Sequence, residues 1–248
     1  MTTLTSPGST VATADNATGR DATVSEAGAS RVAAGCGIAF VVLSFISNFL
    51  PGAPLASDAS PAKVVAYFRD HGSGIKGQEF IGAIGIVALL WWFGAFWQRL
   101  SRAEHDRPRL ATVAAVSLAS GLTLAMVAGS VQAAAAQRAT TDPSLLPALW
   151  TLSIVALAAA GIGVGTSLIA SCVVTYRARM APRWTSYLGW AAGLAFLAGS
   201  AGMLSDSNVL NLVALAAFLL WCAWLVATSV LMWRGAGDRE IAAPSAGS

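Results

Sequence analysis

Six stretches of the sequence are long enough and apolar enough to cross a lipid bilayer as helices. A transmembrane helix needs roughly 20 consecutive apolar residues to pass through about 30 Å of hydrocarbon. The stretches contain no Asp, Glu, Lys or Arg except Glu79, which lies at the edge of the second. They cover approximately residues 32–51, 78–98, 110–134, 147–175, 184–204 and 208–233. The sequence therefore predicts an all-α integral membrane bundle with six transmembrane helices.

The composition agrees with lipid as the solvent for this chain. Hydrophobic residues make up 56% of the sequence and charged residues only 11%, whereas a soluble domain contains about 25% charged residues. A soluble globule could not hide this much apolar surface from water. The basic residues lie in short segments beside the apolar stretches rather than along one face, so we expect membrane lipids as partners and no nucleic acid.

The distribution of Lys and Arg predicts the orientation. Eleven of these residues fall at the two termini and in the second and fourth connections, whereas four fall in the first, third and fifth. Positively charged connections stay in the cytoplasm. We therefore expect both termini to be cytoplasmic.

The two ends of the chain differ from the apolar stretches. Residues 1–30 are rich in Ser, Thr, Ala and Gly and contain no apolar stretch, so we expect a disordered cytoplasmic tail. We expect a second disordered cytoplasmic tail at residues 235–248. The transmembrane domain then covers residues 31–234.

The first outer connection has the pattern of a short amphipathic helix. Ser60 suits the N-cap, Pro61 suits the first turn, and Gly72 and Gly74 are typical of a helix end. Three apolar residues share one side of this helix: Val64, Val65 and Phe68. We expect the helix to lie along the outer membrane surface, with a solvated loop helix as the alternative.

Motifs for catalysis, cofactors and metals are missing from the sequence. The two histidines, His71 and His105, lie in connections, and neither has a second histidine or a cysteine at a ligand spacing. The three cysteines lie inside apolar stretches and form no disulfide framework. The centres of the predicted spans contain no ionisable residue, which disfavours transport coupled to an ion gradient. We expect no cofactor and no metal. On balance, we also expect no enzymatic activity.

Four polar residues fall at similar depth near the outer ends of the predicted spans. They are Asn48, Glu79, Gln132 and Asn211. In one interpretation they simply face headgroups and water. In the other they converge on a shallow outward-facing pocket that the 61–71 helix covers, with Glu79 as its charged or proton-sharing member. Either Arg69 or Lys76 would then be the ion partner of Glu79.

Glycines at a spacing of four residues predict close contacts between helices. Gly161 and Gly165 belong to the fourth span, and Gly189 and Gly193 to the fifth. In lipid, this spacing lets two helix backbones approach closely. Packing within one chain is the simpler interpretation, and contacts in a homo-oligomer are the alternative.

Pairs of tryptophans lie in the middle of two spans. Trp91 and Trp92 belong to the second span, and Trp221 and Trp224 to the sixth. They indicate either an aromatic box for a ligand or ordinary packing and lipid-facing positions.

Two segments resemble a known group of membrane proteins. Residues 58–71 read DASPAKVVAYFRDH, and residues 99–104 read RLSRAE. With the order of the spans, they resemble uncharacterised multi-pass membrane proteins of high-GC Gram-positive bacteria over about residues 31–234. The resemblance implies the bacterial inner (plasma) membrane as the location. It implies no established activity, cofactor or catalytic residue.

Two functional hypotheses follow from these features. The first is a non-enzymatic membrane protein that binds a lipid, a small apolar molecule or a protein partner. The alternative is a small permease or membrane enzyme with an outward-facing polar pocket around Glu79.

Overall fold

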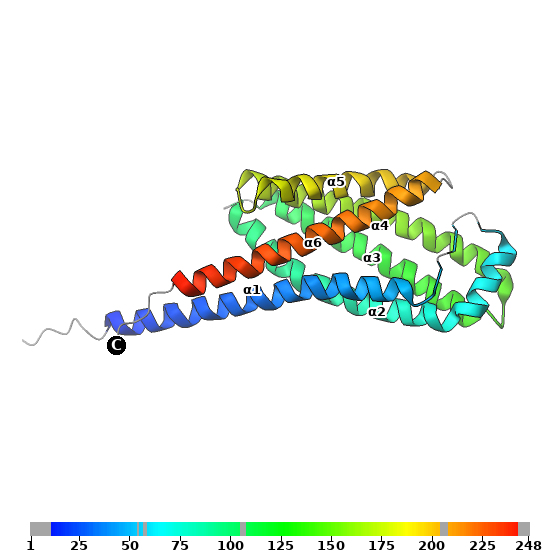
Figure 1. The fold of residues 1–248 in the computed structure, drawn as a ribbon, viewed down its shortest axis with the longest axis horizontal. Helices are drawn as coiled ribbons and strands as arrows, with labels where there is room; N and C mark the ends of the chain where they lie inside the picture. The colour runs from blue at the N-terminus through cyan, green and yellow to red at the C-terminus, as the bar shows by residue number, and fades with distance from the viewer. Residues whose placement is uncertain (1–10, 54, 57–58, 105–107, 204–207, 243–248) are drawn as a thin grey trace, which may run out of the picture.

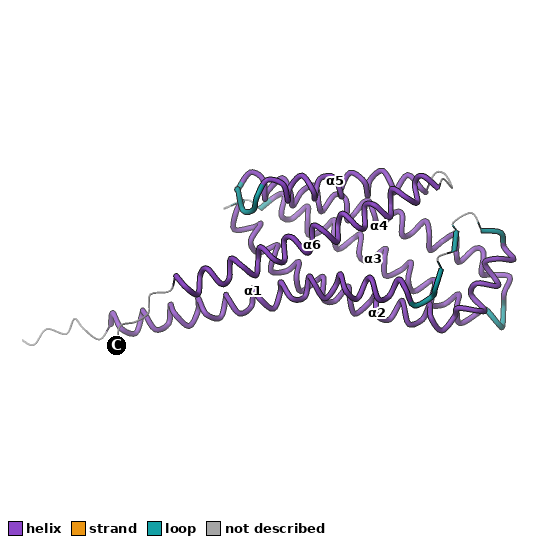
Figure 2. Tube along the Cα trace, in the orientation of Figure 1, coloured by secondary structure: helices purple, strands orange, loops and turns teal. Residues whose placement is uncertain are grey.

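The computed structural model describes residues 11–53, 55–56, 59–104, 108–203 and 208–242, and within these ranges its regular structure is helical (Figure 2). The α-helices are α1 (Val11–Phe49), α2 (Pro61–Ala103), α3 (Arg109–Arg138), α4 (Leu146–Arg177), α5 (Arg183–Gly199) and α6 (Asn208–Ala242). Short 3₁₀ helices, Pro143–Leu145 and Ser200–Met203, precede α4 and follow α5. The predicted all-α class is confirmed.

The helices form an elongated bundle in which successive helices run in opposite directions (Figure 1). α3 packs against α4, α1 against α2, and α6 against both α1 and α5. The start of α1 and the end of α6 extend past the other helices at one end of the bundle (Figure 1). We call the opposite end, where α1 ends and α2 begins, the far end.

Among the residues that the structure describes, five helical segments are long and apolar enough to cross a membrane. They are Gly28–Phe49, Pro61–Ala103, Arg109–Arg138, Pro143–Arg177 and Val209–Gly235. The expected span at 184–204 is not among them. Its helix, α5, has 17 residues and ends where the 3₁₀ helix Ser200–Met203 begins. The finding is thus an all-helical chain with five candidate membrane-spanning helices.

α1 begins within the expected N-terminal tail, and α6 ends within the expected C-terminal tail. α1 begins at Val11 and α6 continues to Ala242, whereas residues 1–10 and 243–248 lie outside the described residues. The sequence from Val11 to Phe49 contains no proline. Extending an existing helix needs no new nucleus, so the apolar part of α1 can propagate into the polar residues before it.

The expected outer helix is not a separate element. It begins at Pro61 as predicted, but it continues through Gly72 and Gly74 into α2 with a bend (Figure 1). A Cβ atom added at Gly74 would lie 2.7 Å from the Leu50 carbonyl oxygen. This glycine therefore permits close contact with the end of α1, and it does not end the helix.

The apolar side of this first part of α2 faces protein. Val64 and Phe68 are buried, and the ring of Phe68 meets Trp150 edge-on with centroids 6.1 Å apart. The residues that complete this cluster come from the end of α3 and the start of α4: Ala135, Ala136, Ala139 and Leu146. The segment thus closes the far end of the bundle, and its apolar face is not available to lie on a membrane surface.

Glu104 joins the end of α2 to the start of α3. Its carboxylate accepts hydrogen bonds from the backbone N–H groups of Leu110 at 3.2 Å and Ala111 at 2.7 Å. These N–H groups belong to the first turn of α3, which has no helical partner for them and favours negative charge. Glu104 therefore acts as a cap for α3 from six residues upstream.

Replacing Glu104 with alanine should lower the free energy of unfolding by about 1 kcal/mol, the usual cost of a lost helix cap. Thermal unfolding of the purified protein in detergent measures this change. Asp70→Ala is the control, because Asp70 is an exposed acid of α2. Equal stability of the two variants would contradict the capping role.

Candidate functional site

The predicted polar residues of α2 and α3 lie along one seam at the far end. Arg69 Nε donates to the Ala139 carbonyl oxygen at 3.3 Å, and Glu79 lies against Gly129. These two pairs agree with a single antiparallel register of α2 and α3. A step of ten residues forward on α2, from 69 to 79, matches a step of ten residues back on α3, from 139 to 129. The same register sets Lys76 level with Gln132. Lys76 and Gln132 are thus three residues from the Glu79–Gly129 pair, whereas Arg69 lies ten residues before Glu79 on α2.

Glu79 occupies a notch in α3. An oxygen of its carboxylate lies where the Cβ atom of a larger residue at position 129 would be. The side chain is half-buried. Among the described residues, Glu79 forms no hydrogen bond and no ion pair. The predicted ion partners are placed otherwise, because Arg69 binds Ala139 and Lys76 is exposed.

Both asparagines are exposed. Asn48 is exposed, and its Nδ2 donates to the Ser44 carbonyl oxygen of its own helix at 2.8 Å. Asn211 is exposed near the start of α6, which lies beside the end of α5 and away from the end of α1 (Figure 1). The start of α6, which contains Asn211, thus lies on another side of the bundle from the end of α1.

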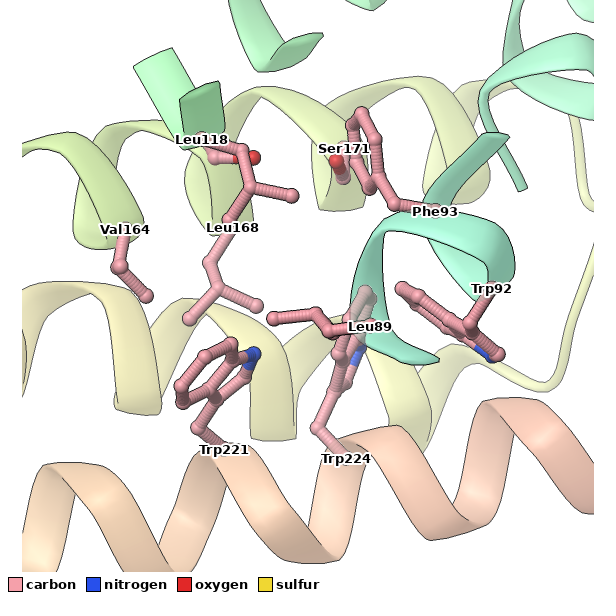
Figure 3. Close-up of a pocket in the computed structure, with 10 residues that line it drawn as sticks. Leu89, Trp92, Phe93, Leu118, Val164, Leu168, Ser171, Trp221 and Trp224 are labelled. Carbon is pink, nitrogen blue, oxygen red and sulfur yellow. The ribbon is translucent and has the colours of Figure 1, made fainter. Parts of the chain in front are cut away.

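A small cavity lies in the middle of the bundle, between α2, α3, α4 and α6 (Figure 3). Its volume is about 10 Å³, which is about the space that one water molecule needs. It is lined by Leu89, Trp92, Phe93, Leu118, Val164, Ser167, Leu168, Ser171, Trp221 and Trp224. No ligand larger than water fits this space as the structure stands.

The mid-span tryptophans pack against one another and do not form an open box. Trp92 stacks on Phe96 with ring centroids 4.9 Å apart and meets Trp224 edge-on at 5.7 Å. Trp221 lies against Phe40 of α1 at 5.3 Å. Trp91 points the other way, with 70% of its surface exposed. Three of the four tryptophans are therefore core residues, and Trp91 faces outward.

The predicted packing glycines lie where helices of one chain touch. Added Cβ atoms at Gly165 and Gly193 would each lie within 2.9 Å of the other residue's carbonyl oxygen, so α4 and α5 meet there. At Gly161 the nearest atom would be Ser200 Oγ at 2.6 Å. Gly189 lies against Cys172 of α4 and Trp224 of α6.

Sequence reasoning missed three other glycines at close contacts, Gly37, Gly121 and Gly129. Gly121 and Gly163 bring the backbones of α3 and α4 together, Gly37 lies against Trp92 and Ser229, and Gly129 forms the Glu79 notch. Nothing in the sequence separates these from the remaining glycines, because the residue that each one meets is distant along the chain.

Metal ligands are not grouped in the part of the chain that the structure describes: no three His, Cys, Asp or Glu residues lie close enough to hold an ion. Cys36, Cys172 and Cys222 are free thiols.

No protein-family model, curated protein or solved structure matches this chain.

Proposed function

We propose that this chain is a six-span protein of the bacterial plasma membrane with both termini in the cytoplasm. α5 has 17 residues, about 25 Å at helical rise, and the 3₁₀ helix Ser200–Met203 adds about 8 Å. Together they match the hydrocarbon thickness of about 30 Å. α5 runs beside α4 and α6 (Figure 1). The eleven-to-four distribution of Lys and Arg supports cytoplasmic termini.

We infer that the protein is a non-enzymatic binding protein whose outer surface holds a lipid or small apolar molecule, or a protein partner. The observation that carries this proposal is the packed interior. Ligand pockets measure about 300–1,000 Å³, whereas the central cavity measures about 10 Å³. Two large apolar side chains of α2 are instead directed outward, with Phe80 69% and Trp91 70% exposed. A hydrophobic ligand would therefore bind the outside of the bundle.

Purification in native lipids followed by mass spectrometry tests this proposal. We expect a lipid, small apolar molecule or protein to remain bound in stoichiometric amount after the bulk lipid has been removed. A protein that retains nothing in stoichiometric amount would contradict it.

Glu79 favours a second candidate, a small permease or membrane enzyme with an outward-facing pocket. A half-buried carboxylate without a partner among the described residues is typical of a site for a proton or cationic solute. Solute uptake into proteoliposomes that is lost in Glu79→Gln would favour this candidate over the binding protein.

A further inference from the structure

Two charged residues mark the ends of the apolar part of α2. Glu79 and Arg99 are twenty residues apart, and the residues between them contain no charge. Twenty residues of helix rise about 30 Å, which equals the thickness of the hydrocarbon core. Glu79 therefore lies at the level of the lipid headgroups.

Lys76 stands beside Glu79 at the same boundary. The two residues are three positions apart on α2, a spacing that makes their side chains neighbours on a helix surface. Lys76 is exposed, whereas Glu79 is half-buried against α3. The boundary thus carries a positive group facing outward and a negative group set into the seam.

An apolar stripe continues from Lys76 into the apolar part of α2. At helical spacing, four exposed side chains share a face with Lys76: Phe80, Ile84, Val87 and Trp91. These side chains cover the length of an acyl chain that extends inward from the headgroup level.

The Glu79 carboxylate can accept a cation from outside the protein. It is fixed in the Gly129 notch and has no hydrogen-bond or ion partner among the described residues. A carboxylate at the edge of hydrocarbon without a partner is unfavourable. An ammonium group is a complementary ligand for this carboxylate, next to the positive charge of Lys76.

We propose that this face of α2 binds one zwitterionic phospholipid whose headgroup carries a primary amine. The lipid ammonium pairs with Glu79, the lipid phosphate pairs with Lys76, and an acyl chain follows the stripe from Phe80 to Trp91. A lipid with a single negative charge and no amine satisfies Lys76 but leaves Glu79 without a cation. The inference rests on the proposed function, because it names the lipid class and its site.

Native mass spectrometry of the full-length protein tests the site with two lipids of identical acyl chains, phosphatidylethanolamine and phosphatidylglycerol. We expect one molecule of phosphatidylethanolamine to bind about fivefold more tightly, as one headgroup ion pair near the membrane surface provides. Glu79→Gln should remove the preference. The matched control Asp70→Asn, an exposed acid of the same helix, should keep it.

A second variant guards against a folding defect in Glu79→Gln. Gly129→Ala places a Cβ atom in the notch and leaves the charge of Glu79 unchanged, so it should weaken the preference by displacing the carboxylate. Equal binding of the two lipids to the wild-type protein, or a preference that survives Glu79→Gln, would overturn the inference. If a lipid still copurifies in stoichiometric amount in that case, the proposed function stands; if none does, both fail.

Discussion

Replacing Gly163 with alanine should lower the free energy of unfolding by about 3 kcal/mol, at the upper end of the usual cost of overpacking. An added Cβ atom would lie 2.5 Å from the Ser117 carbonyl oxygen and 2.6 Å from the Gly121 backbone nitrogen. Both atoms belong to the α3 backbone, which cannot turn aside as a side chain can. The two helices must separate along their shared contact, and unfolding in detergent followed by circular dichroism measures the loss.

Gly94→Ala is the control for this prediction. Gly94 lies in the exposed face of α2, and a Cβ atom there would have nothing within 4 Å. Alanine should leave stability unchanged or raise it by up to about 1 kcal/mol, because alanine favours a helix over glycine. Equal losses from both substitutions would show that the α3–α4 contact is not as close as described.

Replacing Trp92 with alanine should lower the free energy of unfolding by about 3–5 kcal/mol, the range for removing a large aromatic side chain from a core. Trp92 is 1% exposed and contacts Phe96 and Trp224. Its loss would leave a cavity between α2 and α6. The midpoint of unfolding in a detergent-denaturant series provides the measurement.

The neighbouring tryptophan supplies a matched control. Trp91 has the same side chain one position earlier, with 70% of its surface exposed. Trp91→Ala should change stability by less than about 1 kcal/mol, because the contacts that the Trp91 side chain loses are with the surrounding lipid and not with the protein core. If Trp91→Ala costs as much as Trp92→Ala, the assignment of Trp92 to the core is wrong.

The helices could be predicted because apolar length and proline position are local signals. α1 ends at Phe49 just before Pro51, α3 begins after Pro108, and α5 begins after Pro182, close to the predicted bounds. α1 and α6 extend beyond the predicted spans, because an existing helix continues into polar residues without a new nucleus. The amphipathic pattern of the first part of α2 predicts that one face is buried. It does not show whether protein or membrane covers that face.

The sequence predicts the depth of the candidate-site residues along their helices, but it does not predict which way their side chains face. Helical rise sets Asn48, Glu79 and Gln132 near one end from the sequence alone. The partner of Glu79 depends on which faces of α2 and α3 meet, and Gly129 carries no side chain that could signal it. The cap at Glu104 was missed for a similar reason, because its partners Leu110 and Ala111 lie beyond a turn whose path the sequence does not define.

Whether α5 crosses the membrane determines the number of membrane crossings. Alkaline phosphatase, which is active only outside the cytoplasm, can be fused after Ala139, Arg179, Met203 or Arg234. Six spans with cytoplasmic termini predict activity after Ala139 and Met203 and none after Arg179 and Arg234. The same result for the fusions after Arg179 and Met203 would show that α5 does not cross the membrane, and would contradict the six-span account.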